Sequence, residues 1–267
     1  TFGAAFEYIQ RQEPGRRVAS VRSAEVIHLT RSVVLTGDDF RQIDCDPSLS
    51  AGGGGNNAGI SDQGCLCKDG LRTKCTMGLH MAHMYGGSSH IFHMRIEKCG
   101  QQGVLGKYCS HLHLLGDSPS SVFEGNAVEY AHQRGYNIHG THRSTFRFNV
   151  ASDVRGANFY VEDGNEMWTN LEYNVAVCPY ALNDPFKSGC TIPASPNGEA
   201  DGANNQAGIW LTGAQNNLIG NRMSNSFNGM LCDVNFHARG GGPAKNKACV
   251  LSQRVGRWDG NTFHNHG

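Results

Sequence analysis

Short apolar stretches in which hydrophobic side chains return at every second residue recur along most of this chain, and turns rich in Gly and Asn separate them. Examples are "NFYVED" at 158–163 and "YNIHG" at 136–140. A β-strand has this period, whereas an amphipathic helix repeats after three and four residues. The pattern therefore predicts many short strands, each with one face in a core.

The predicted strands belong to a repeat of slightly more than twenty residues. Asn126, Asn149 and Asn174 each stand before an apolar strand, at spacings of 23 and 25 residues. Gly208 and Gly229, which are 21 residues apart, continue the pattern after an interruption. Three short strands fit into each repeat, and a repeat of this length made of short strands is typical of a solenoid. We therefore expect an all-β fold, a parallel β-helix.

Stacking explains why such a repeat is stable. One coil cannot bury its own apolar face, but coils stacked about 4.8 Å apart share a continuous core. The repeat predicts that inward-facing residues of two successive coils stack in pairs: Val150 on Ala127, Phe159 on Tyr136, and Val161 on Ile138. The turn asparagines are expected to bond to one another along the axis, as polar ladders do in other stacked β-structures.

Four segments follow from these patterns. Residues 1–40 are expected to be the end of an upstream β domain that leads into the solenoid, and residues 41–75 a Gly- and Cys-rich insertion loop. The β-helix is expected over 76–236, with a long excursion at 179–205. Residues 237–267 would form a C-terminal loop and a further coil. Because the chain does not start with methionine, we expect it to be part of a longer polypeptide or assembly.

Charge and composition narrow the class of partner. The 23 basic residues balance the 23 acidic residues, so neither general nucleic-acid binding nor attraction to an anionic membrane surface is expected. No apolar run reaches the roughly 18 residues of a membrane-spanning helix. The 35 glycines and a charged fraction of 17% suit a β-protein with many tight turns.

The ten cysteines favour disulfides and an oxidising compartment. Local bridges are expected across two loops: Cys178 to Cys190, and Cys232 to Cys249. Cys45 would pair with one of the next three cysteines, which are Cys65, Cys67 and Cys75. Those three also raise the possibility of a structural zinc site, but their spacing lacks the usual two Cys-x-x-Cys pairs.

Two histidines in "CSHLHLLGD" define the candidate site. His111 and His113 are two residues apart in a predicted strand, so both project from one face. Counting from the turn asparagines puts His139 and Glu162 at the same position of successive coils. One of the first two histidines would extend this row by a further coil on the outer face. Adjoining turns add more titratable side chains: Asp117, His142, Asp163 and Glu166.

This row of imidazoles and carboxylates suggests catalytic chemistry. Hydrolysis of a glycosidic bond usually needs two carboxyl groups roughly 5–10 Å apart. Glu162 or Glu166 would then donate a proton, and Asp163 or Asp117 would be the base or nucleophile. The histidines could instead transfer protons near neutral pH.

Two other interpretations use the same residues. His111, His113 and His139 with Glu162 form a nitrogen and oxygen ligand set suited to zinc or a similar divalent metal. Neither a phosphate loop nor a dinucleotide fingerprint occurs, so no other cofactor is suggested. The bland alternative is that the outer face of a solenoid is polar by default and that the aspartates beside glycines are turn formers.

Four segments together resemble one protein family: "RSAEVIHLTRSVVLTGD", "CGQQGVLGKYCSHLHLLGD", "YNIHGTHRSTFRFNV" and "NFYVEDGNEMWTNLEYNVAV". Similar segments occur in this order in the cell-migration-inducing and transmembrane hyaluronidases and in the fibrocystin-like receptors. The resemblance covers most of residues 20–236. It implies a right-handed parallel β-helix of the pectate-lyase-like kind, placed after a domain named for eight glycines.

The resemblance also implies a location and a function. Proteins of this family are extracellular or lie at the cell surface, and some members bind or depolymerise hyaluronan. We therefore expect a module that binds, and in the enzymatic case cleaves, a hyaluronan-type polysaccharide. The alternative is a non-catalytic structural segment of a large cell-surface or ciliary protein, where the solenoid contacts other surface proteins.

Overall fold

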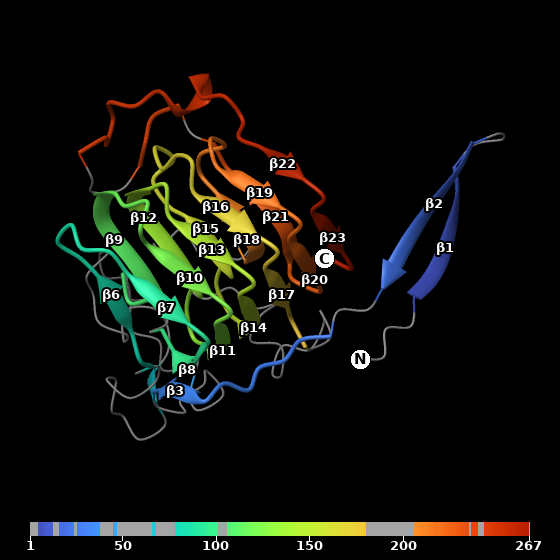
Figure 1. Cartoon of the computed structure of the whole chain (residues 1–267), viewed down its shortest axis with the longest axis horizontal. Helices are drawn as coiled ribbons and strands as arrows, with labels where there is room; N and C mark the ends of the chain where they lie inside the picture. Colours follow the sequence, from blue (N-terminus) through green and yellow to red (C-terminus); the bar gives the residue numbers. More distant parts are fainter. Residues whose placement is uncertain are drawn as a thin grey trace.

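The computed structural model shows a solenoid of short parallel strands (Figure 1). It describes residues 5–12, 16–23, 26–37, 45–46, 66–67, 78–100, 106–179, 206–234, 236–239 and 243–266. In these residues three parallel sheets run along the solenoid, and no α-helix occurs. The predicted fold class, a parallel β-helix, is confirmed.

Each complete coil contributes one strand to each sheet. The first sheet contains β7 (His90–Phe92), β10 (Val122–Glu124), β13 (Thr145–Arg147), β16 (Asn170–Glu172), β19 (Asn217–Ile219) and β22 (Trp258–Asp259). The second contains β3 (Val33–Thr36), β8 (Met94–Cys99), β11 (Ala127–Ala131), β14 (Val150–Val154), β17 (Val175–Val177), β20 (Arg222–Ser224) and β23 (Thr262–His264). The third contains β6 (Met81–His83), β9 (Ser110–Asp117), β12 (Tyr136–His142), β15 (Phe159–Val161), β18 (Ala207–Leu211) and β21 (Asn228–Cys232).

Smaller elements accompany the solenoid. Strand β1 (Ala5–Gln12) pairs with β2 (Arg16–Ser23), and β4 (Cys45–Asp46) pairs with β5 (Leu66–Cys67), both antiparallel. Among the described residues, a 3-10 turn, η5 (Val250–Ser252), lies in the C-terminal part. No helix of the described segments is both long enough and apolar enough to cross a bilayer.

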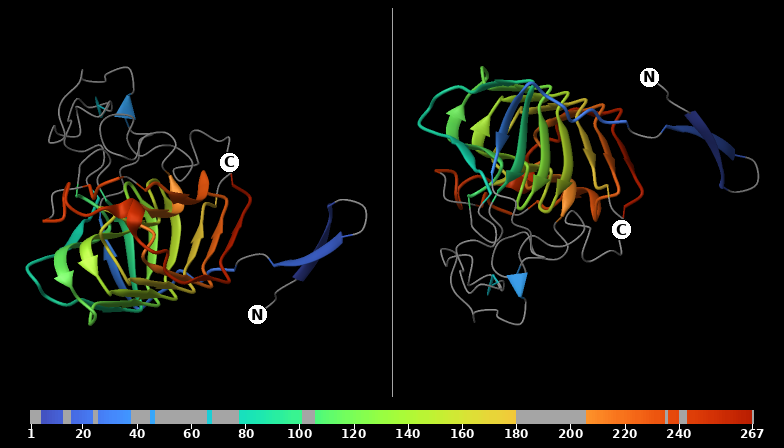
Figure 2. Two further views of the ribbon diagram at one scale, coloured as in Figure 1. Left: turned by 90° about the horizontal axis from the view of Figure 1, so that it is seen from above. Right: turned by 90° about the horizontal axis from the view of Figure 1, so that it is seen from below.

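The register of the sheets confirms the predicted stacking. Tyr136 pairs with Phe159 in the third sheet, and Ala127 pairs with Val150 in the second. The rings of Tyr136 and Phe159 stack with their centroids 4.8 Å apart, and both side chains are fully buried. Views from above and below show successive coils side by side along the axis (Figure 2). Residues one repeat apart in sequence are therefore direct neighbours in space.

Turn asparagines form the predicted ladder along the axis. The members are Asn126, Asn149, Asn174, Asn221 and Asn261, each at the start of the strand that joins the second sheet. In each of the first four, the backbone N–H donates to the side-chain oxygen of the next asparagine at 3.0 Å. The ladder satisfies buried backbone groups at a corner where the sheets do not.

The cysteine pairing differs in part from expectation. Cys99 and Cys109 form a disulfide that the sequence did not single out. Cys178 is disulfide-bonded, whereas its predicted partner lies outside the described residues. The expected bridge from Cys232 to Cys249 is wrong, because both cysteines are free and exposed. Strand β21 places Cys232 in the third sheet. The backbone of Cys249 instead pairs with that of His237 in an isolated antiparallel β-bridge.

The other cysteine expectations concern the insertion loop. The register of β4 and β5 sets Cys45 opposite Cys67, one of its three predicted partners. Cys65 and Cys75 lie outside the described residues, so the structure does not address a zinc site there.

Candidate functional site

The candidate site lies on the third sheet, where three successive coils bring their histidines and carboxylates together. Strand β9 carries His111 and His113, strand β12 carries His139, and Glu162 follows β15 directly. The register pairs His113 with His139. The Glu162 N–H donates to the Ile138 carbonyl, which continues the pairing one residue beyond β15. The predicted row from the histidine pair through His139 to Glu162 is therefore present.

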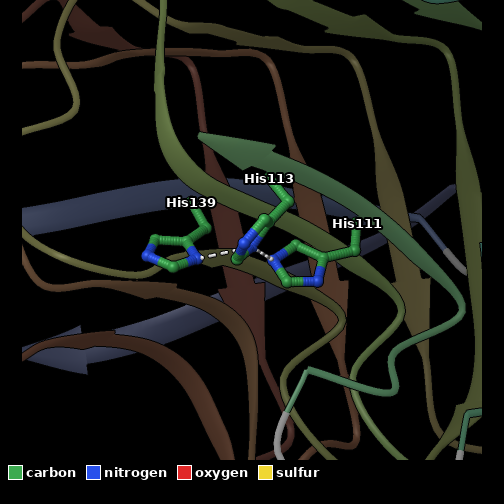
Figure 3. Close-up of side chains that lie close together, drawn as sticks. All are labelled: His111, His113 and His139. Atoms are coloured by element: carbon green, nitrogen blue, oxygen red, sulfur yellow. Dashed lines mark hydrogen bonds between the residues drawn. The ribbon is translucent and has the colours of Figure 1, made fainter. Parts of the chain in front are cut away.

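The three imidazoles form one cluster, with His113 between the other two (Figure 3). Its Nδ1 lies 3.3 Å from His111 Nε2 and 3.1 Å from His139 Nδ1. One nitrogen from each ring can be chosen so that all three lie within 4.8 Å of one another. Side chains separated by up to 28 residues in sequence thus converge on one point.

Acceptors on the outer side of the cluster determine which ring nitrogens carry hydrogen. His111 Nδ1 lies 3.1 Å from the Gly106 carbonyl oxygen, and His139 Nε2 lies 3.1 Å from Asp163 Oδ2. The carbonyl oxygen can only accept, so His111 Nδ1 is the N–H donor, and the Asp163 carboxylate favours hydrogen on His139 Nε2 by its charge, because this contact lacks hydrogen-bond geometry. The inner nitrogens, His111 Nε2 and His139 Nδ1, then present lone pairs when the rings are neutral.

Glu162 completes the cluster. Its Oε2 lies 3.9 Å from His111 Nε2 and 3.8 Å from His139 Nδ1, and it accepts a hydrogen bond from Asn137 Nδ2 at 2.7 Å. Its Oε1 lies 3.7 Å from Arg134 Nη1. The carboxylate is therefore held by an amide on one oxygen and faced by a guanidinium on the other.

Arg134 is buried in an aromatic cage that the sequence did not reveal. It donates to the Tyr108 hydroxyl at 2.7 Å, and its guanidinium carbon lies 3.9 Å from the Tyr160 ring centroid and 5.6 Å from that of Trp210. Tyr160 and Trp210 are paired residues of β15 and β18. Aligning the coil repeat across the 179–205 excursion would have found this pair. Tyr160 and Trp210 are the middle residues of "FYV" and "IWL", the two segments that pair between β15 and β18.

Glu166 lies behind the cluster and is fully buried. Its two carboxylate oxygens accept hydrogen bonds from the backbone N–H groups of Gly140, Asp163 and Gly164 at 2.8–3.1 Å. These bonds tie the turn after β15 to the bulge of β12, where the register shifts between His139 and Thr141. The position of Glu166 suits a structural clasp more than contact with a substrate.

Asp117 and His142 lie outside the cluster, beyond that bulge. They are paired residues at the ends of β9 and β12. The Asp117 side chain is 55% exposed and forms an ion pair with Arg143. His142 Nδ1 accepts a hydrogen bond from the Met167 backbone N–H at 3.3 Å. Neither residue is drawn into contact with the three imidazoles.

The cluster is far less open than an outer-face row was expected to be. His111 and His139 are only 3% and 7% exposed, and Asp163 is 1% exposed. His113 and Glu162 are partly exposed and form the accessible edge. The C-terminal part contributes to this closure, because the Arg239 N–H donates to the Asp163 carbonyl at 2.8 Å. Whether the 179–205 excursion covers the row lies outside the described residues.

Burial and the neighbouring charges set the protonation of the rings. Burial lowers the pKa of His111 to about 2, and the nearby His139 adds to this effect. Burial, together with His139, also lowers the pKa of His113. Burial alone would lower the pKa of His139 too, but the carboxylates of Asp163 and Glu162 outweigh it and raise that pKa. His111 and His113 are therefore neutral at pH 7 and offer lone pairs.

Comparison with known proteins places this domain among large relatives. The family model described as "CEMIP beta-helix" matches residues 76–267. Fibrocystin-L of Homo sapiens is 28% identical over 255 residues, which are 91% of this chain and 6% of that protein. Protein rliB of Dictyostelium discoideum is 31% identical over 150 residues, 55% of this chain and 13% of that protein. The chain thus spans only a small part of these relatives, and no solved structure matches it.

Proposed function

The chain belongs to the CEMIP β-helix family, and we propose that its third sheet carries a site that binds and cleaves an extracellular polysaccharide of the hyaluronan type. The convergence of His111, His113 and His139 with Glu162 is the observation that carries the proposal. Hydrolysis of a glycosidic bond needs groups that donate and accept protons beside the bond. The cluster supplies imidazole and carboxylate groups within one small volume.

Glu162 is the carboxylate we assign to the reaction. Of the four acidic residues predicted for the site, it alone lies in the cluster with part of its side chain, 14%, exposed to solvent. Asp163 and Glu166 are buried and face His139 and backbone N–H groups. We assign them positioning roles, and His113 the role of the accessible imidazole.

The ends of the site suit an anionic sugar chain. Lys107, whose Nζ lies 2.8 Å from His80 Nε2, precedes β9 at one end, and Arg143, which is paired with Asp117, follows β12 at the other. Trp168, which is 52% exposed, stands one coil from Arg143, because the Arg143 N–H donates to the Met167 carbonyl. An exposed indole supports stacking against a sugar ring.

Incubation of the whole chain with hyaluronan of defined size tests this function. We expect shorter fragments on a sizing gel with the unmodified protein, and a loss of about 100-fold or more in rate with Glu162→Gln. Glu172→Gln, on the first sheet, is the matched control and should leave the rate unchanged. The control isolates the loss of a carboxylate at the cluster from the loss of a surface charge.

A second candidate function is a structural segment that serves as a spacer and contact wall at the cell surface. The near-complete burial of His111, His139 and Asp163 favours it, because buried polar side chains that bond to one another can serve to join the coils. Unchanged polysaccharide size together with no measurable polysaccharide binding would establish this alternative and remove the first proposal.

A further inference from the structure

The inner atoms of the cluster surround a common point, and we propose that this point binds a divalent transition-metal ion, best matched by zinc. The four ligand atoms are His111 Nε2, His113 Nδ1, His139 Nδ1 and Glu162 Oε2. This inference deepens the proposed function, since it concerns the same residues. Metal binding can nevertheless be measured without any polysaccharide.

Two of the three nitrogen–nitrogen distances match a tetrahedral ion, and the third pair lies within 4.8 Å. Zinc–nitrogen bonds of about 2.0–2.1 Å place tetrahedral ligand atoms roughly 3.3–3.5 Å apart. His113 Nδ1 is 3.3 Å from His111 Nε2 and 3.1 Å from His139 Nδ1, close to this spacing. Glu162 Oε2 lies 3.9 Å from His111 Nε2 and 3.8 Å from His139 Nδ1, so it needs to move toward them by only about 0.5 Å.

The surroundings prepare the rings for a cation. The Gly106 carbonyl accepts the outer N–H of His111, and the Asp163 carboxylate lies 3.1 Å from the outer nitrogen of His139, so hydrogen on both outer nitrogens leaves the lone pairs of both rings facing inward. Histidine ligands of metals usually donate their other N–H to a carbonyl or carboxylate, which fixes the ring orientation. The cluster shows one contact of each type, and Glu162 with Asp163 offsets the charge of a divalent ion.

The cluster without a cation has too few hydrogens for its contacts. His111 and His139 both present lone pairs at the centre, so the only hydrogen there is one on His113 Nδ1. That hydrogen can be donated to His111 Nε2 or to His139 Nδ1, but not to both at once. A metal ion accepts all three lone pairs at once, with the His113 hydrogen on its outward nitrogen. The rival arrangement is a His139 imidazolium, whose extra proton takes the place of the ion.

Ligand type decides which ion is expected. Three imidazoles and one carboxylate suit zinc and other late divalent metals, whereas calcium and magnesium prefer an all-oxygen site. With all four protein ligands bound the tetrahedral site is closed, so an ion here would activate a water only if Glu162 left its position or the ion gained a fifth ligand. Partly exposed His113 and Glu162 mark the side from which water and substrate reach the ion.

Titration of the whole, chelator-stripped chain with Zn²⁺ against a chromophoric chelator tests the proposal. The parent for all variants is Cys232→Ser/Cys249→Ser, because exposed free thiols also bind zinc. We expect one zinc per chain, with an affinity that falls by about 100-fold or more in His113→Ala. His90→Ala removes an exposed histidine from β7 and should leave the affinity unchanged. Co²⁺ should give the visible absorption of a four-coordinate site, absent in His113→Ala.

Circular dichroism confirms that each variant is folded, and Glu162→Gln provides a second test of the same site with almost unchanged side-chain volume. The proposal is overturned if zinc binds equally to the parent, His113→Ala and Glu162→Gln. It is also overturned if equimolar Ca²⁺ displaces the zinc, or if the folded parent binds no zinc. Zinc binding without polysaccharide cleavage supports the metal site and removes the proposed function. Cleavage that persists undiminished after chelation retains the function and overturns a role of the ion in it.

Discussion

His139 and Asp163 belong to successive coils, yet His139 Nε2 lies 3.1 Å from Asp163 Oδ2. The parallel register produces this contact, because Glu162 is the neighbour of His139 and Asp163 comes one residue later. Asp163 is almost fully buried, so it has little solvent to compete for the imidazole. The charge of Asp163 thus favours hydrogen on His139 Nε2 and a lone pair on Nδ1, which faces the cluster.

Asp163→Asn should reverse that choice. The amide of Asn can donate to His139 Nε2, which would move the ring hydrogen to Nδ1, where it faces His113. We expect the protonated nitrogen of the neutral ring, detected by nitrogen-15 NMR, to switch from Nε2 to Nδ1. Zinc affinity should fall by about 10–100-fold. Asp117→Asn, at the exposed end of β9, should change neither quantity.

The pH dependence of stability should report Glu166. Burial and the charge of Asp163 raise its pKa from 4.5 to about 7, although backbone N–H groups such as that of Gly140 oppose the rise. The folded pKa lies above the unfolded one, so the stabilising contribution of the protonated group is complete below about pH 4.5. It is lost as the pH rises through about 7, by at most about 3 kcal/mol.

Urea unfolding at pH 5 and pH 8 measures this effect in the parent and in Glu166→Gln. The variant lacks the titration, so the free energy of unfolding of the parent should fall more between the two pH values than that of the variant. Glutamine also places an amide donor among backbone N–H groups, which lowers stability at both pH values. A difference between the two proteins that stays constant with pH would contradict the raised pKa.

Asn149→Ala should destabilise the solenoid by about 3–5 kcal/mol, because it leaves several buried groups without partners. Asn149 Nδ2 donates to the Phe123 carbonyl and to Asn174 Oδ1, and its Oδ1 accepts two hydrogen bonds from Asn126. Chemical denaturation gives the free energy of unfolding. Asn170→Ala, in the partly exposed first sheet, is the control and should cost about 1 kcal/mol or less.

Removal of the disulfide between Cys99 and Cys109 should lower the free energy of unfolding by about 3 kcal/mol, the value expected from the entropy of a loop of about ten residues. The bridge joins the end of β8 to the residue before β9, two positions ahead of His111. We expect Cys99→Ala/Cys109→Ala to show this loss in thermal or chemical unfolding. A reducing agent should destabilise the parent more than the double variant, which keeps the disulfide of Cys178, and equal sensitivity of both would contradict the assignment.

The stacking of the coils could be predicted because it follows from local spacing. The asparagine repeat of 23 and 25 residues identified the ladder, and the same count placed His139 beside Glu162. A strand period of two put His111 and His113 on one face. These relationships need only the repeat length and the alternation of side chains, both of which are readable in a single chain.

Other features were hidden because they depend on loops of irregular length. Tyr160 pairs with Trp210 across an interval of 50 residues, since the excursion separates β15 from the next coil of the third sheet. The cage around Arg134 follows from that pairing. The predicted bridge between Cys232 and Cys249 was wrong for a similar reason, as sequence proximity says little about where two loop ends point.

The sequence by itself determined the parallel β-helix and the order of residues along its walls, because a repeated spacing dictates which side chains stack. Only the tertiary structure decided that His111, His139 and Asp163 are enclosed while His113 and Glu162 remain at the edge. Enclosure depends on where loops and the C-terminal segment pass over a sheet, and on side-chain directions across three coils. Such contacts join residues with no common period, so no local pattern encodes them.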